Sequence, residues 1–141
     1  RSTLFPYTTL FRSRTGGMWE ASKNNTHAAI DMIPKAVVIC DWHYERADKT
    51  AVYFAMKGLN VITCPWRNPS LSVIQLQDMI AFRNESTKVM KPYFQGVMQT
   101  VWSGAPNFVR DFYANRKDPQ RGDSTPHESF RQLFAEIDKL K

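Results

Sequence analysis

The sequence has few of the residues that build several common kinds of site. Only two of its 141 residues are cysteines, Cys40 and Cys64, which are too few for a disulfide framework or an all-cysteine metal site. No apolar run approaches the ~18 residues of a membrane span. Basic residues are interleaved with acidic ones, so no basic stripe indicates nucleic-acid binding. We therefore expect no nucleic-acid partner, no membrane span, no metal and no cofactor. We expect both cysteines to be small buried core residues.

The first thirteen residues look foreign to the rest of the chain. Residues 1–13 read RSTLFPYTTLFRS, which resembles the translation of a common high-throughput sequencing adapter at every position. We interpret this segment as an artefact of gene assembly and exclude it from the fold; the alternative is a natural N-terminal arm. Arg1 and Arg12 are its only charged residues, so the net charge falls from +6 to +4 without it. On this interpretation the natural N-terminus is missing, and residues 14–141 are a truncated domain.

Three apolar segments predict buried strands. The first lies within 35–45, the second spans 60–66 and the third spans 96–102; each ends at or near a tryptophan. Their β-branched residues and short lengths favour strands over helices. Cys40 and Cys64 are 24 residues apart, as are Trp42 and Trp66. We therefore expect the first two strands to present these residues at equivalent places.

Helical patterns lie between and after these strands. Asp48 and Ser70 are the expected N-caps of two helices, and Gly58 is the expected C-cap of the first. Residues 125–128 read TPHE, which predicts a capping box at the start of the last helix. The helices are expected at residues 26–32, 48–57, 70–82, 105–115 and 125–140. His27 and His127 lie in or beside helices and are expected at the surface.

Alternating strands and helices predict an α/β fold with parallel strands. The strands are apolar on both faces, as parallel sheets covered by helices require. An eight-unit barrel of roughly 250 residues averages about 31 residues per unit, so residues 14–141 amount to about half a barrel. We predict the C-terminal half of a (β/α)8 TIM barrel, truncated at the N-terminus. A doubly wound open sheet is the rival, but no glycine-rich phosphate loop follows a strand here.

The strand ends are the expected functional site, because active sites of such barrels lie at the C-terminal ends of the strands. Indole faces suit the apolar face of a sugar ring, and carboxylate, imidazole and guanidinium groups can bind its hydroxyls. Core filling at a strand end is the alternative for each tryptophan. The predicted substrate-binding residues are Trp42, Trp66, Trp102, Asp41, His43, Glu45 and Arg67. Tyr44 and Gln99 also fall at these strand ends.

Asp41, His43 and Glu45 also suggest a metal site or acid–base chemistry. Strict alternation would place the three on one face of the strand, opposite Trp42 and Tyr44. A single such run without a second cluster is a weak metal signal. A glycosidase also needs two carboxylates across the scissile bond, and two carboxylates on one strand end are poorly placed for that.

At these strands the sequence resembles the family 20 glycoside hydrolases, the β-N-acetylhexosaminidases, and most closely their divergent bacterial members. Trp42 followed by Glu45 is similar to the family's Trp-x-Glu strand end. Residues 63–66 (TCPW) are similar to its Ser-Ala-Pro-Trp strand, and residues 96–102 to its last strand, Gly-Gly-Glu-x-x-x-Trp. The resemblance covers approximately Trp19 to Trp102.

The sequence also departs from the family pattern. Residues 67–69 read Arg-Asn-Pro where the family has Tyr-x-Asp, which binds the acetamido group and a sugar hydroxyl. Met98 and Gly104 stand where the family's last strand carries glutamates. The family's Asp-Glu pair, which positions the acetamido group and protonates the leaving oxygen, has no counterpart here. It is expected upstream of this fragment.

The resemblance implies a carbohydrate partner and a mechanism. The substrate's own acetamido oxygen would attack the anomeric carbon in retaining hydrolysis of N-acetylhexosamine-containing glycans, while Trp42 and Trp102 enclose the sugar. This fragment would supply the aromatic wall and be inactive alone. The full-length protein would be periplasmic or secreted. The alternatives are a non-catalytic carbohydrate-binding barrel, or a barrel hydrolase of another family that uses Asp41, His43 or Glu45.

Overall fold

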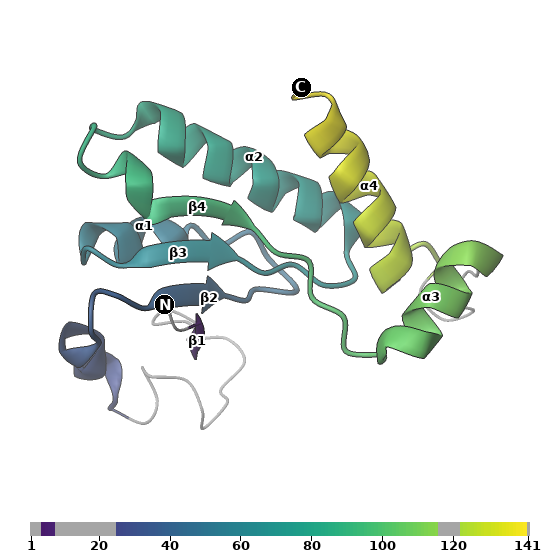
Figure 1. Ribbon diagram of the computed structural model, residues 1–141, viewed down its shortest axis with the longest axis horizontal. Coiled ribbons are helices and arrows are strands. Elements are labelled where there is room, and N and C mark those ends of the chain that lie inside the picture. The colour runs from purple at the N-terminus through teal and green to yellow at the C-terminus, as the bar shows by residue number, and fades with distance from the viewer. Residues whose placement is uncertain (1–3, 8–24, 116–121, 141) are drawn as a thin grey trace.

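The computed structural model describes residues 4–7, 25–115 and 122–140. These residues form an α/β domain in which a parallel sheet is flanked by helices (Figure 1). The elements in chain order are β1 (Leu4–Tyr7), the 3-10 helix η1 (His27–Met32), β2 (Val38–Asp41), α1 (Thr50–Met56), β3 (Asn60–Thr63), α2 (Pro69–Glu85), the 3-10 helix η2 (Lys91–Tyr93), β4 (Phe94–Val97), α3 (Ala105–Ala114) and α4 (Pro126–Asp138).

The sheet is open and its strands follow one another in chain order. β2 pairs with β3 and β3 with β4, all in parallel. β1, which lies inside the segment that we interpret as adapter-derived, pairs with β2 and extends the order to β1-β2-β3-β4. The predicted α/β fold with parallel strands is confirmed. No closed barrel is seen in the described ranges.

The hydrophobic core lies between the sheet and helices α1 and α2. Ile39, Val61 and Phe94, one from each of β2, β3 and β4, are at most 1% exposed and belong to one cluster. Phe54 of α1 and Met79 of α2 pack into the same cluster, so both helices cover the same face of the sheet. Each fully buried side chain of this size contributes roughly 1.5–3 kcal/mol. The residues that alternate with them along the strands, such as Cys40, face the other side.

The third strand differs from its prediction. It was expected at residues 96–102, but β4 ends at Val97. The chain beyond it still follows β3, because Met98 N donates to Thr63 O and Thr100 N donates to Pro65 O, each at 2.9 Å. Pro65 has no N–H to donate in return, so a regular ladder cannot continue past this point.

The register also corrects the expected equivalence of the two cysteines. Cys40 lies opposite Ile62, two residues before Cys64. Cys64 N instead donates to Asp41 O at 2.9 Å, beside the end of β2. The core sets this offset, because it pairs the fully buried Ile39 with the fully buried Val61. Both cysteines are buried and free, as expected.

Of the four predicted caps, Thr125 is correct: it caps α4, with its hydroxyl accepting from Glu128 N at 3.3 Å. The C-cap of α1 is Lys57, and the predicted Gly58 lies one residue later with a φ of +73°. The other two predictions are wrong. Asn68, not Ser70, caps α2 by accepting from Leu71 N at 3.0 Å. Asp48 does not cap α1, which begins after Lys49 without a side-chain cap.

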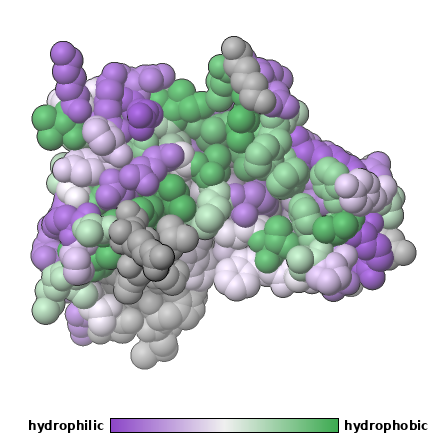
Figure 2. All heavy atoms as spheres, viewed as in Figure 1, coloured by the Kyte–Doolittle hydropathy of each residue, from purple (hydrophilic) through white to green (hydrophobic). Residues whose placement is uncertain are grey.

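Helix α4 packs on α2 through small polar residues as well as through Leu133. The hydroxyls of Ser72 and Ser129 are 2.5 Å apart and fully buried. His127 is buried as well, 3.2 Å from the Thr125 hydroxyl, so its predicted surface position is wrong. His27 is exposed, as predicted. Apolar side chains gather around α4 where it meets α2 and α3 (Figure 2).

Candidate functional site

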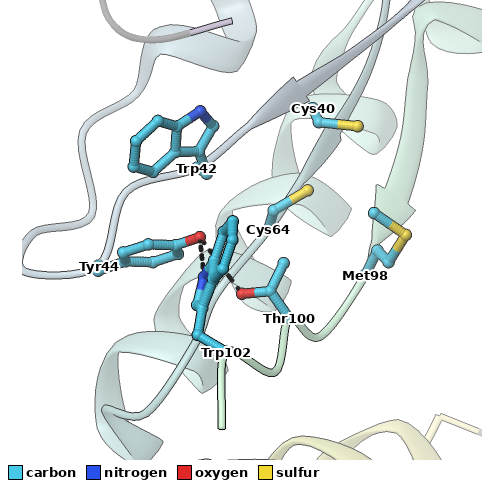
Figure 3. A pocket seen from close by; sticks show the side chains of 7 residues that line it. All are labelled: Cys40, Trp42, Tyr44, Cys64, Met98, Thr100 and Trp102. Atoms are coloured by element: carbon cyan, nitrogen blue, oxygen red, sulfur yellow. Dashed lines mark hydrogen bonds between the residues drawn. The ribbon is translucent and has the colours of Figure 1, made fainter. Parts of the chain in front are cut away.

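A cavity of about 240 Å³ opens where the parallel strands end, on the side of the sheet away from α1 and α2. Its lining is mostly aromatic and sulfur-bearing. Both tryptophans that the family resemblance singled out reach it. Figure 3 shows the residues that line it: Cys40, Trp42, Tyr44, Cys64, Met98, Thr100 and Trp102.

The two indoles reach the same face of the sheet from the two strands that flank β3. Trp42 directly follows β2, so the alternation of the strand carries it to the cavity side, two residues after Cys40. Trp102 lies five residues beyond β4 and is 67% exposed. It is held by a hydrogen bond from its Nε1 to the hydroxyl oxygen of Tyr44 at 2.7 Å.

Tyr44 is the polar centre of the cavity. Its hydroxyl oxygen accepts from Trp102 and lies 3.5 Å from Thr100 Oγ1, while Thr100 itself donates to Pro65 O at 2.7 Å (Figure 3). Because Thr100 gives its hydrogen to Pro65 O, its Oγ1 can accept the phenol's own hydrogen only over the long 3.5 Å contact. An oxygen of a ligand that lies closer to the phenol can take that hydrogen instead.

Trp66, Arg67 and Glu45 support Tyr44 from outside the cavity. The ring centroids of Tyr44 and Trp66 are 5.4 Å apart, and the guanidinium of Arg67 lies 4.1 Å from the Trp66 centroid. Arg67 also pairs with Glu45 at 3.6 Å. These three predicted site residues line no part of the cavity. They form a stack that fixes the tyrosine, an interaction worth about 0.5–1.5 kcal/mol per aromatic contact.

Asp41 and His43 face away from the cavity, toward the start of α1. Both are almost fully buried, and His43 Nε2 lies 3.1 Å from Asp41 Oδ1. Thr50 completes the cluster: its hydroxyl donates to Asp41 Oδ2 at 2.6 Å and is 2.9 Å from His43 Nε2. Asp48 Oδ2 lies 3.3 Å from His43 Nδ1. The expected separation of Asp41 and His43 from Trp42 and Tyr44 is confirmed, but Glu45, expected on the face of Asp41, pairs with Arg67 outside the buried cluster.

This buried cluster has the side chains of a catalytic group, but a substrate cannot reach them. A carboxylate, an imidazole and a hydroxyl are in hydrogen-bond reach of one another, which is the arrangement used to activate a nucleophile. Thr50 is only 7% exposed, however, and none of these side chains lines the cavity. Gln75 adds a further internal bond by donating to His43 O at 2.8 Å. The cluster fastens the end of β2 to α1 and α2.

Gln99, also placed at a strand end by the sequence, has a structural contact on each side. Its amide nitrogen donates to Trp66 O, and its amide oxygen accepts from Ser129 at 3.3 Å. It therefore joins the segment after β4 to the end of β3 and to α4.

Burial changes the acidity of the cavity thiols. It raises the pKa of Cys64 far above its ordinary value, and the neighbouring Cys40 raises it further. Burial also raises the pKa of Cys40, while the hydrogen bond from Cys64 acts in the opposite direction. Both groups are therefore protonated thiols at neutral pH.

Comparison with known proteins adds nothing to this geometry. No model of a known protein family matches the chain, and no curated protein matches it significantly.

Two negative findings concern the described part of the chain. No group of three or more His, Cys, Asp and Glu side chains is arranged to hold a metal ion within residues 4–7, 25–115 and 122–140. Over the same ranges, no helix is both long and apolar enough to cross a bilayer.

Sequence reasoning gave no binding role to Met98 and Thr100, and it expected Cys40 and Cys64 only as core residues. Tyr44 was expected at a strand end, on the face of Trp42, but was not among the predicted substrate-binding residues. Met98 and Thr100 alternate in the same way after β4, but the expected position of that strand concealed them.

Proposed function

We propose that this cavity is the aromatic wall of a sugar-binding pocket, and that the chain is the C-terminal part of a glycoside hydrolase. The substrates would be glycans that contain N-acetylhexosamine. The observation that carries the proposal is the convergence of Trp42 and Trp102 on one cavity, with the Tyr44 hydroxyl beside Trp102. Indoles offer flat faces to the C–H side of a sugar ring, and the phenol offers a donor to one of its oxygens.

The size of the cavity supports a single sugar ring. Its volume of about 240 Å³ is just below the ~300–1,000 Å³ usual for small-molecule pockets. Trp102 is largely exposed and lies at the opening, so a second sugar ring could stack against its outer side.

The proposed reaction is substrate-assisted retaining hydrolysis, in which the acetamido oxygen of the sugar attacks the anomeric carbon. A carboxylic acid must protonate the leaving oxygen. No carboxylate lines the cavity among the described residues, so this chain would bind and orient the sugar while the acid comes from elsewhere. Tyr44 would then donate to an oxygen of the sugar ring or of the acetamido group. The resemblance to family 20, which covers approximately Trp19 to Trp102, supports this proposal.

A half-barrel is the fold that we propose for this activity. The strands follow chain order, and α1 and α2 pack on one face of the sheet, as the repeating units of a (β/α)8 barrel do. A doubly wound sheet reverses its strand order and places helices on both faces. Re-sequencing the source locus across the Ser13–Arg14 junction tests the proposal. We expect an open reading frame with further strand–helix units and an Asp-Glu strand end; a start codon at the junction would contradict it.

A non-catalytic sugar-binding barrel is the second candidate. It is favoured by the lack of a carboxylate among the lining residues in the described ranges. Both candidates predict binding without turnover for this chain, and they differ in whether the upstream sequence carries the acid. The third reading, with Asp41, His43 or Glu45 as catalyst, is weakened because Asp41 and His43 are buried outside the cavity and Glu45 pairs with Arg67.

Sugar binding is tested by titrating N-acetylglucosamine and its short β-linked oligomers into the purified chain by calorimetry. Trp102→Ala should weaken binding at least tenfold, which corresponds to about 1.4 kcal/mol. Tyr113→Ala is the matched control, because Tyr113 is 82% exposed on α3 and away from the cavity. We expect its affinity to equal that of the wild type within twofold. No saturable binding by the wild type, or equal losses in both variants, would refute the proposal. A chromogenic N-acetylglucosaminide should not be hydrolysed.

A further inference from the structure

The two outer strands of the unit formed by β2, β3 and β4 have different free edges. β3 lies between the other two, so β2 and β4 each have one side that β3 does not occupy. Backbone N–H and C=O groups on such a side form a template for a further strand, and proteins usually block it. An edge that is not blocked is open to strand addition.

The β4 edge is blocked by a bulge and by a side chain. The register with β3 shifts between Val61 and Ile62, so β4 carries one extra residue, Gln95. The guanidinium of Arg83 donates to Phe94 O at 2.8 Å. Bulges and charged side chains are two of the devices that keep edge strands from pairing. Phe94 O is therefore not free for a further strand.

The β2 edge has neither device. Its four residues pair with β3 without a register shift, and all four are buried. Its only charged residue, Asp41, accepts from the Thr50 hydroxyl at 2.6 Å and is 1% exposed, so it does not guard the edge. Burial along the whole strand is typical of strands inside a parallel sheet. β2 therefore has the character of an interior strand, which needs a neighbour on both sides.

A foreign strand occupies the β2 edge. β1 pairs with β2 in parallel over four residues, from Leu4 opposite Val38 to Tyr7 opposite Asp41 (Figure 1). Residues 4–7 belong to the segment that we interpret as adapter-derived, whose side chains were not selected for this sheet. Pro6 also has no N–H to donate to a ladder. The pairing therefore depends on the main chain of the occupant, as it does for peptides that bind proteins by strand addition.

We propose that the β2 edge is a docking site for an extended, uncharged peptide that adds to the sheet as a parallel strand, and that β1 fills it as a tethered ligand. The peptide would run in the direction from Val38 to Asp41, as β1 does. Its main-chain hydrogen bonds would supply the affinity, and its alternate side chains the selectivity. The four residues of β1 carry no charge, which suits an edge where β2 is buried along its length.

The test releases β1 and supplies the same strand as a separate peptide. Phe5→Pro combined with Tyr7→Pro leaves residues 5–7 without an N–H, so β1 can no longer donate to β2. A fluorescent peptide with the sequence of residues 1–13 should then bind this double variant saturably, as read by anisotropy. Its affinity for the wild type should be lower by roughly tenfold or more, because β1 competes for the edge. The matched control is the same peptide with proline at positions 5 and 7, which should bind neither protein.

A second measurement needs no variant and decides the matter if the double variant does not fold. Alternate amides of β2 point toward β1 and the others toward β3. All the amides of β2 should therefore exchange hydrogen in the wild type roughly tenfold or more slowly than those of an unstructured chain.

Four results would overturn the proposal. They are fast exchange at alternate positions of β2, no peptide binding by a folded double variant, equal affinity for the wild type, and equal binding of the proline peptide. A dimer of the double variant would assign the edge to a second copy, and would likewise overturn the peptide as its occupant. Sugar titration measures none of these quantities, so the two proposals fail separately.

Discussion

Replacing Thr50 by valine should destabilise the chain by about 2–3 kcal/mol. Valine keeps the shape of the side chain but removes the hydroxyl, which donates to Asp41 Oδ2 at 2.6 Å and lies 2.9 Å from His43 Nε2. A hydrogen bond to a charged group contributes about 1.5–3 kcal/mol. A buried carboxylate that loses its donor is left with the full free-energy penalty of its removal from water. Asp41 is 1% exposed, so water cannot replace the lost bond.

Thr63→Val is the matched control, because it makes the same change at the same burial. Thr63 and Thr50 are each 7% exposed. The Thr63 hydroxyl, in contrast, has no hydrogen-bond partner among the described residues. Removing an unpaired buried hydroxyl should be neutral or stabilise the chain by roughly 1 kcal/mol. The two variants should therefore differ by about 3 kcal/mol.

Urea unfolding followed by far-UV circular dichroism measures both free energies of unfolding. The reasoning is refuted if Thr50→Val costs less than about 0.5 kcal/mol, or if the two variants change stability equally. In either case the buried cluster of Asp41, His43 and Thr50 would not stabilise the end of β2.

Two further predictions concern a helix cap and a buried thiol. Asn68→Ala should lower the free energy of unfolding in urea by about 1 kcal/mol, because it removes the acceptor for Leu71 N. The control Ser70→Ala should change that free energy by less than about 0.3 kcal/mol. Equal losses would show that Asn68 does not cap α2. The native state holds the Cys64 proton more tightly than the unfolded state does, since its pKa is raised from 9.0. The unfolding free energy should therefore fall as the pH rises above 9, and Cys64→Ala should make this fall smaller.

The elements that the sequence predicted best are those with local signals. The apolar runs at β2 and β3 carry β-branched residues, and the capping pattern at Thr125 is complete within four residues. Asn68 was missed although its signal was present, because a capping residue followed by proline is a typical helix start. Asp48 does not cap α1 because its carboxylate accepts from Arg46 at 3.0 Å and lies 3.3 Å from His43 Nδ1, contacts that its own sequence position does not reveal.

The site was predicted in part, because alternation is a local property and register is not. Alternation correctly separated Trp42 from Asp41 and His43. The repeated spacing of cysteines and tryptophans suggested that equivalent residues would lie side by side. Packing of the core instead pairs Cys40 with Ile62, two residues before Cys64. This register brings Cys64 to the cavity and places Trp66 against the Tyr44 ring, outside the cavity. Burial of His127 likewise depends on the contact of α4 with α2, which no single segment encodes.

The double attachment of the β2 end has a consequence for the entropy of ligand binding. On one side of the strand, Asp41 and His43 are bonded to Thr50, and Gln75 holds the His43 carbonyl. On the other side, the same short segment carries Trp42 and Tyr44 into the cavity. Ordering a mobile side chain on binding costs about 0.5–1.5 kcal/mol, and rings on an anchored backbone avoid part of that cost. The buried cluster would thus keep the proposed sugar-binding surface rigid before a ligand arrives, although none of its side chains lines the cavity.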